Sequence, residues 1–249
     1  VANFRFFAEQ VVKMQDKKFP MDDAENNVIQ KPVGIAGLIT PWNLPLYLLS
    51  WKIAPALAMG NTVVAKPSEL TPLTADLLAK VLVEVGLPAG VVNIVHGLGS
   101  EVGQAIVEHP EIKLISFTGG TETGRKVGAG ASAQFKKVSL ELGGKNPLIV
   151  CDDADLKNAS KWILLSAFSN AGQRCASGSR IIIFENIYNE LIEMLLENTK
   201  KLNIGPSDKD DLGPVINEKQ LNNMLAAIEK ASLDGANILC GGKKLTDNK

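Results

Sequence analysis

Short apolar runs alternate with helical patterns along most of the chain. Runs of Val, Ile, Leu and Ala bounded by Gly, Pro or Asn predict strands, and the first five are residues 33–39, 62–65, 91–95, 113–117 and 136–140. Strand–helix–strand units of this length predict parallel strands joined by right-handed crossovers. We therefore expect an α/β fold with a doubly wound parallel sheet, in which ligands bind beyond the carboxyl ends of the strands.

Helix ends can be read between these strands. Thr71 followed by Pro72 predicts a capped helix start, and Gly86 predicts where that helix ends. Ser100 is expected to cap a helix that runs to about Glu108, and another helix should begin near Thr121.

A second series of elements follows the pair Gly143-Gly144. We predict strands over 146–150 and 179–184, and helices over 156–169, 187–202 and 218–233. The expected domains are therefore residues 1–143 and 144–249.

The chain ends show two other patterns. Residues 1–12 lack a start methionine and have the apolar spacing of a helix. Residues 20–31 are polar and predict a loop-like extended arm. Residues 242–249 predict a polar loop. We expect an internal piece of a longer protein.

Composition narrows the class of protein. The chain has 249 residues and a formal net charge of −1, which argues against a nucleic-acid binder. The most apolar stretch, 39–59, contains Lys52 and three prolines, so we interpret it as buried core, and no secretory signal opens the chain. We expect a soluble protein.

The residues available for metal ligation or disulfide bonds are few. The three cysteines form no CxxC pair, which predicts no disulfide framework and favours a reducing, cytoplasmic location. Only two histidines are present, so no metal site is expected.

Two glycine-flanked runs carry candidate chemistry. Cys175 lies in Asn170-Ala-Gly-Gln-Arg-Cys-Ala-Ser-Gly-Ser179, and Glu141 lies in Leu140-Glu-Leu-Gly-Gly-Lys145. A thiolate nucleophile needs a base or a positive environment near neutrality, so the pair is chemically sensible. The alternatives are a small buried cysteine and a charge at a strand end. Cys151 and Cys240 border apolar runs and are interpreted as structural.

Three further turns follow predicted strands. Lys66 and Glu69 could bind a ribose diol, or they could form a solvated surface ion pair. The run Phe117-Thr-Gly-Gly-Thr-Glu-Thr-Gly124 could place pyrophosphate at a helix N-terminus, or it could be an ordinary glycine-rich turn. Asn43, between two prolines, could donate to an oxyanion or satisfy backbone groups of its turn.

Five motifs occur in order along the chain: the Pro-Trp-Asn turn, Lys-Pro-Ser-Glu, Phe-Thr-Gly-x-Thr, Glu-Leu-Gly-Gly-Lys and Gly-Gln-x-Cys. With these motifs the chain resembles the NAD(P)-dependent aldehyde dehydrogenase superfamily over essentially its whole length. The resemblance implies a Rossmann-like NAD-binding domain followed by part of an α/β catalytic domain. It implies an oxidoreductase that converts an aldehyde to a carboxylic acid through a cysteine thiohemiacetal and thioester. It also implies an oligomerisation arm near residues 20–30 and a homodimer or homotetramer.

The same resemblance assigns residue roles. Cys175 matches the nucleophile, Glu141 the general base and Asn43 the oxyanion-binding amide. The positions that match cofactor contacts are Ile39, Thr40, Trp42, Lys66, Ser68, Glu69, Gly99, Phe117, Thr118, Gly120, Thr121, Gly124, Leu142 and Gly143.

The chain departs from the family pattern in two ways. Gly120 stands where many members carry a serine, so that a backbone amide must serve there, and the family's later Glu-x-Phe-Gly-Pro segment is absent. Two alternatives therefore accompany the dehydrogenase: a catalytically silent nucleotide-binding fragment, and a coenzyme A-acylating relative. The identity of the aldehyde is open.

Overall fold

The structure, a computed structural model, describes residues 2–245. The chain divides into two compact units, one ending at Leu142 and the other beginning at Gly143, and each is described by itself. The functional domains 1–143 and 144–249 stay a prediction. Val1, in the predicted first helix, and residues 246–249, in the predicted final loop, lie outside the described residues.

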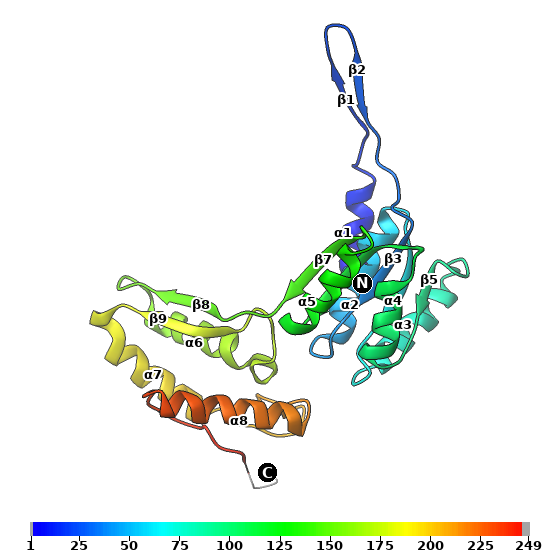
Figure 1. Cartoon of the computed structure of the whole chain (residues 1–249). Helices are drawn as coiled ribbons and strands as arrows, with labels where there is room; N and C mark the ends of the chain where they lie inside the picture. The colour runs from blue at the N-terminus through cyan, green and yellow to red at the C-terminus, as the bar shows by residue number, and fades with distance from the viewer. Residues whose placement is uncertain (1, 246–249) are drawn as a thin grey trace. The chain divides into compact units, whose positions relative to one another are not determined.

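The first unit contains a five-stranded parallel sheet with the order β5-β4-β3-β6-β7. The strands are β3 (Ile35–Ile39), β4 (Thr62–Lys66), β5 (Val92–Ile94), β6 (Ile112–Gly119) and β7 (Lys137–Leu142). The chain proceeds outward from β3 to β5 and then returns to β6, so the order reverses between β3 and β6. The α/β fold with a parallel sheet is thus confirmed (Figure 1).

Helices cover both faces of this sheet. On one face, α1 (Ala2–Val11) packs on α2 (Pro45–Ala58), and α2 on α3 (Leu73–Glu84). The other face carries α4 (Gln104–Glu108) and α5 (Thr121–Ser132). Because strand side chains alternate, Leu38 joins the apolar cluster of α2 and α3, and Ile39 joins that of α4 and α5.

Two predicted helix caps are wrong. Pro72 occupies the cap position of α3, and Thr71 Oγ1 has no hydrogen-bond partner, because a turn from Ser68 to Thr71 precedes the helix. Ser100 lies inside a π-helical segment, Gly99–Gly103, which precedes α4. The predicted closure of α3 is confirmed, since Gly86 follows the helix at φ 77°.

The polar arm is also more regular than predicted. It forms an antiparallel hairpin of β1 (Lys17–Pro20) and β2 (Glu25–Val28), closed by a hydrogen bond from Met21 N–H to Ala24 C=O. Asp22 and Asp23, at the centre of this turn, are common turn residues. All eight strand residues are exposed, and Figure 1 shows the hairpin as a dark blue ribbon extending from its unit.

The second unit contains the parallel pair β8 (Asn146–Val150) and β9 (Gly178–Ile183). The described part of this unit, up to residue 245, also contains the helices α6 (Leu156–Phe168), α7 (Tyr188–Lys200) and α8 (Glu218–Leu233) and the short 3₁₀ segments η2 (Ser169–Gly172) and η3 (Glu185–Ile187). Its buried core consists of Val150, Ile163, Ile187 and Leu191. On the outer face Ile149 pairs with Ile182, and both are exposed.

Within residues 2–245, no helix combines the length and the apolar character needed to cross a membrane.

Candidate active site

The candidate site residues of the first unit gather at the carboxyl edge of its sheet. Lys66, Ile39, Phe117 and Leu140 occupy one row of the strand register. Thr118 pairs with Glu141 one step further along β6 and β7. Leu142 ends β7 and Gly124 lies within α5. The other candidates of this unit follow the strand ends in the chain, and they are Thr40, Trp42, Asn43, Ser68, Glu69, Gly99, Gly120 and Thr121. Ligands of open α/β sheets bind at this edge, near the reversal of strand order.

The alternation of strand side chains separates these residues onto two faces. Ser116, Thr118, Ser139 and Glu141 share the face covered by α2, because Lys52 of α2 donates to Ser116 Oγ at 2.7 Å. Lys66 shares the opposite face with Ile39 and Phe117, which pack with α4 and α5. The candidate base and the main candidate ribose contact are therefore on opposite faces of one sheet.

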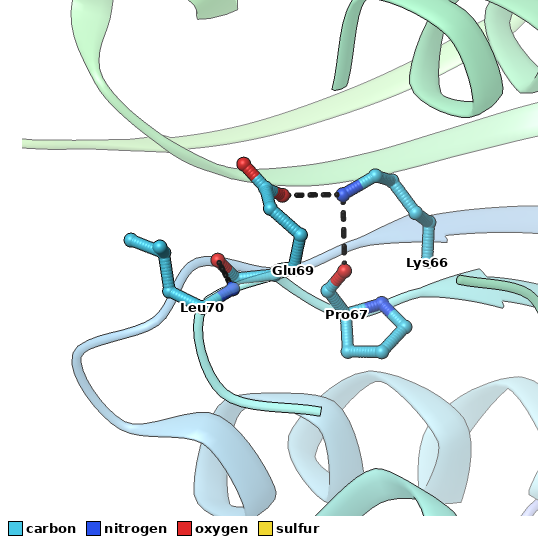
Figure 2. A network of polar contacts seen from close by, with 5 residues as sticks. Lys66, Pro67, Glu69 and Leu70 are labelled. Atoms are coloured by element: carbon cyan, nitrogen blue, oxygen red, sulfur yellow. Dashed lines mark hydrogen bonds and ion pairs between the residues drawn. The ribbon is translucent and has the colours of Figure 1, made fainter. Parts of the chain in front are cut away.

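Lys66 and Glu69 form a half-buried pair (Figure 2). The Lys66 side chain is 3 % exposed, and its Nζ donates at 3.0 Å both to Glu69 Oε2 and to the carbonyl of Pro67. The pKa of Glu69 lies below its ordinary value, first because its own backbone donates to the carboxylate and then because of Lys66. Glu69 is 45 % exposed, so the pair offers a buried donor and an accessible acceptor.

The glycine turn after β6 is open at its start and packed one turn later. Gly120 is the cap residue of α5, with an extended backbone, and no atom lies within 4 Å of the position that a β-carbon would occupy. Such an uncrowded helix start suits a phosphate that approaches backbone amides. At Gly124, a β-carbon would overlap the Leu142 side chain. Gly124 thus has a packing role between α5 and β7.

Lys52 is a buried cation that the sequence pattern did not identify as part of the site. Burial lowers the pKa of Lys52 to about 8, and the negative charge of Glu141 opposes this shift. Its signal in the sequence is a single lysine within the apolar stretch 39–59, where the lysine argues against a membrane span.

Cys175 occupies a tight turn in the second unit. The backbone N–H of Ser177 donates to the carbonyl of Arg174 at 3.2 Å, which places Cys175 at the first corner of the turn. Asn170 and Ala171, just before it, have φ values of 55° and 54°, in the left-handed region. Residues other than glycine seldom adopt this conformation, and it is concentrated at functional sites. Cys175 itself is exposed.

The expectation that Cys175 is more accessible than the other two cysteines is wrong. Cys151 and Cys240 are both exposed. Cys151 comes directly after β8, beyond its buried end, and Cys240 lines an apolar hollow of about 450 Å³ between α6, α7 and α8. Exposure alone therefore does not distinguish Cys175 from them.

The structure brings the candidates together in two sets. Glu141, Asn43 and the cofactor positions up to Leu142 belong to the first unit, whereas Gly143 and Cys175 belong to the second. The joint action of Cys175, Glu141 and Asn43 stays a prediction. In the described part of the chain, no group of three or more His, Cys, Asp or Glu side chains could hold a metal ion.

Comparisons with known proteins extend over the whole chain. The profile of the aldehyde dehydrogenase family matches residues 1–249. Mouse retinaldehyde dehydrogenase 3 is 48 % identical over 254 residues, which cover 99 % of this chain and 49 % of that protein. Bovine 2-aminomuconic semialdehyde dehydrogenase is 46 % identical over 245 residues, covering 97 % of this chain and 50 % of that protein.

Solved structures show the same fold. Betaine aldehyde dehydrogenase from Staphylococcus aureus, in complex with NAD+, has a TM-score of 0.95 at 40 % identity, covering 99 % of this chain and 50 % of that one. An NAD+ complex of aldehyde dehydrogenase from Bacillus cereus has a TM-score of 0.96 at 37 % identity, with coverage of 99 % and 51 %. The chain spans about half the length of the curated relatives it matches. It belongs to the aldehyde dehydrogenase family.

Proposed function

We propose that the protein is an NAD-dependent aldehyde dehydrogenase that converts an aldehyde to a carboxylic acid. The observation that carries this proposal is the carboxyl edge of the first sheet. There Glu141 pairs with Thr118, directly before the glycine turn that starts α5. Membership of the family and the NAD+ complexes of similar structures support it.

The residues present fit NAD. The open start of α5 at Gly120 leaves room for a pyrophosphate, and the Lys66–Glu69 pair offers a donor and an acceptor to a ribose. When bound, NAD supplies the hydride acceptor. The resemblance assigns the other contacts to the residues that surround these two turns.

The proposed reaction uses three side chains. The Cys175 thiolate attacks the aldehyde carbon, and the oxyanion that forms accepts hydrogen bonds from the Asn43 amide and the Cys175 backbone N–H. Loss of a hydride from that carbon leaves a thioester on Cys175. Glu141 takes a proton from water, whose oxygen attacks the thioester, and the carboxylic acid and the Cys175 thiolate are released.

Kinetics of Glu141→Gln in the complete gene product test this proposal. We expect a burst of NADH close to one equivalent, followed by slow turnover, because the thioester forms but water is no longer activated. Cys175→Ser should remove the burst as well. Equal loss of burst and turnover in Glu141→Gln would contradict the role of Glu141. Turnover that requires coenzyme A and yields only the acyl-coenzyme A thioester would favour the acylating alternative.

We also propose that the protein is cytoplasmic and that it assembles as a homodimer or homotetramer through the β1–β2 hairpin. Three free cysteines fit a reducing compartment. A two-stranded sheet is marginally stable by itself, and Phe19 and Val28 of this hairpin are exposed apolar residues. A second copy of the chain would cover them.

A further inference from the structure

We infer that Asn146 is a positioning residue, which holds the turn that carries Cys175 in its reactive geometry. The inference rests on the proposed function for its catalytic consequence, but the contact that carries it lies within the second unit alone. Asn146 is the first residue of β8, and the sequence pattern gave it no role.

One amide nitrogen of Asn146 connects two points of the turn. Its Nδ2 donates to the carbonyl of Cys175 at 2.6 Å and to the carbonyl of Ser177 at 3.0 Å. A side-chain amide has two N–H donors, so this nitrogen supplies one to each carbonyl. Both carbonyls are thereby directed toward β8.

The backbone of the turn is fixed from its other side as well. The N–H of Ser177 donates to the carbonyl of Arg174, and the N–H of Gly178 donates to Ser166 Oγ at 3.0 Å. Neither bond involves the carbonyl of Cys175, which accepts a hydrogen bond from Asn146 Nδ2 and is restrained by it. Because this carbonyl belongs to the nucleophile itself, its restraint limits the orientations that the Cys175 side chain can adopt.

This restraint matters most for the attack on the aldehyde. A nucleophile reacts fast when its position is set before the reaction, whereas substrate binding depends less on that position. Loss of the Asn146 donors should therefore lower kcat and leave the KM for aldehyde nearly unchanged.

The test compares three variants in the complete gene product. Asn146→Asp keeps the size of the side chain but has no hydrogen to donate, and Asn146→Ser keeps one donor. Asn198→Asp is the matched control, since Asn198 Nδ2 donates to the buried Ser160 Oγ elsewhere in the same unit. Amide hydrogen exchange at Ser177 and Gly178, followed by mass spectrometry, reports the turn without requiring turnover.

We expect exchange at Ser177 and Gly178 to accelerate in Asn146→Asp, and kcat to fall by about tenfold or more with KM within about twofold. Asn146→Ser should recover part of both losses, and Asn198→Asp should change neither beyond its effect on overall stability. Unchanged exchange, or an equal fall of kcat in the control, would overturn the inference. If no aldehyde is oxidised even by the wild type, the proposed function fails, and hydrogen exchange alone decides whether Asn146 holds the turn.

Discussion

The buried cation Lys52 makes the stability of the first unit sensitive to pH. Its pKa in the folded state is about 8, below the ordinary value of 10.5, because burial disfavours the charged form. Below pH 8 both the folded and the unfolded chain carry the proton, and the folded chain bears the full cost of the buried charge. As the pH rises from 8 toward 10.5, the folded chain loses the proton first, so the free energy of unfolding increases.

We therefore expect the wild type to gain stability relative to Lys52→Met between pH 7.5 and 9.5. The relative gain should approach about 1.4 kcal/mol per pH unit at most. Urea unfolding of both proteins at several pH values measures it. Parallel curves would show that Lys52 does not titrate in this range.

Cofactor choice should depend on the carboxylate of Glu69. A carboxylate beside a ribose accepts a hydrogen bond from the 2′-hydroxyl but repels a 2′-phosphate. We expect NAD to bind more tightly than NADP, and Glu69→Ser to narrow the difference, with buried Lys66 unchanged. Calorimetric dissociation constants for both cofactors measure this. Glu84→Ser, at the opposite end of α3, is the control, and a wild type that prefers NADP would contradict the assignment.

At the residue scale, the sequence predicts contacts between side chains that are close in the chain. Lys66 and Glu69 are three positions apart, in a turn directly after a strand, so a short run predicts their proximity. Lys52 and Asn146 were missed because their partners are distant in the chain. Ser116 is 64 positions from Lys52, and Cys175 is 29 from Asn146.

At the scale of elements, one helix cap shows how local chemistry stabilises the second unit. Asp155 accepts a hydrogen bond from the N–H of Asn158 at 3.1 Å and so satisfies the first turn of α6. We expect Asp155→Ala to lower the free energy of unfolding by about 1 kcal/mol. Thr71→Ala should be neutral or slightly stabilising, because Thr71 Oγ1 is buried without a partner. Chemical denaturation of both variants checks this, and a larger loss in Thr71→Ala would contradict it.

Most elements could be predicted because their periodicity and boundaries are local properties. β8 and α8 match the predicted ranges, and α5 begins at Thr121 as expected. The π-helical segment before α4 and the β1–β2 hairpin were not predicted. Both are defined by backbone hydrogen bonds that the spacing of hydrophobic residues does not predict. In the hairpin, apolar and polar residues do not alternate regularly, because all the strand residues are exposed.

At the scale of the whole molecule, the proposed assembly of copies of the chain through the β1–β2 hairpin can be tested by the molar mass in solution. Phe19→Asp places a charge on the exposed hairpin and should reduce the molar mass in solution toward that of a monomer, because a buried carboxylate is costly in an interface. Light scattering coupled to size exclusion measures the mass. Phe135→Asp is the control, since Phe135 is 98 % exposed and lies outside the hairpin. Equal masses for the wild type and Phe19→Asp would argue against this mode of assembly.

The outward pair Ile149 and Ile182 has a practical consequence for anyone who prepares this protein. These side chains are 60 % and 48 % exposed and lie on adjacent parallel strands. Exposed apolar side chains on neighbouring strands favour aggregation at high protein concentration, particularly near the isoelectric point. The sequence pI of about 6.2 therefore favours alkaline buffers, mild surfactant and low protein concentration during purification and storage.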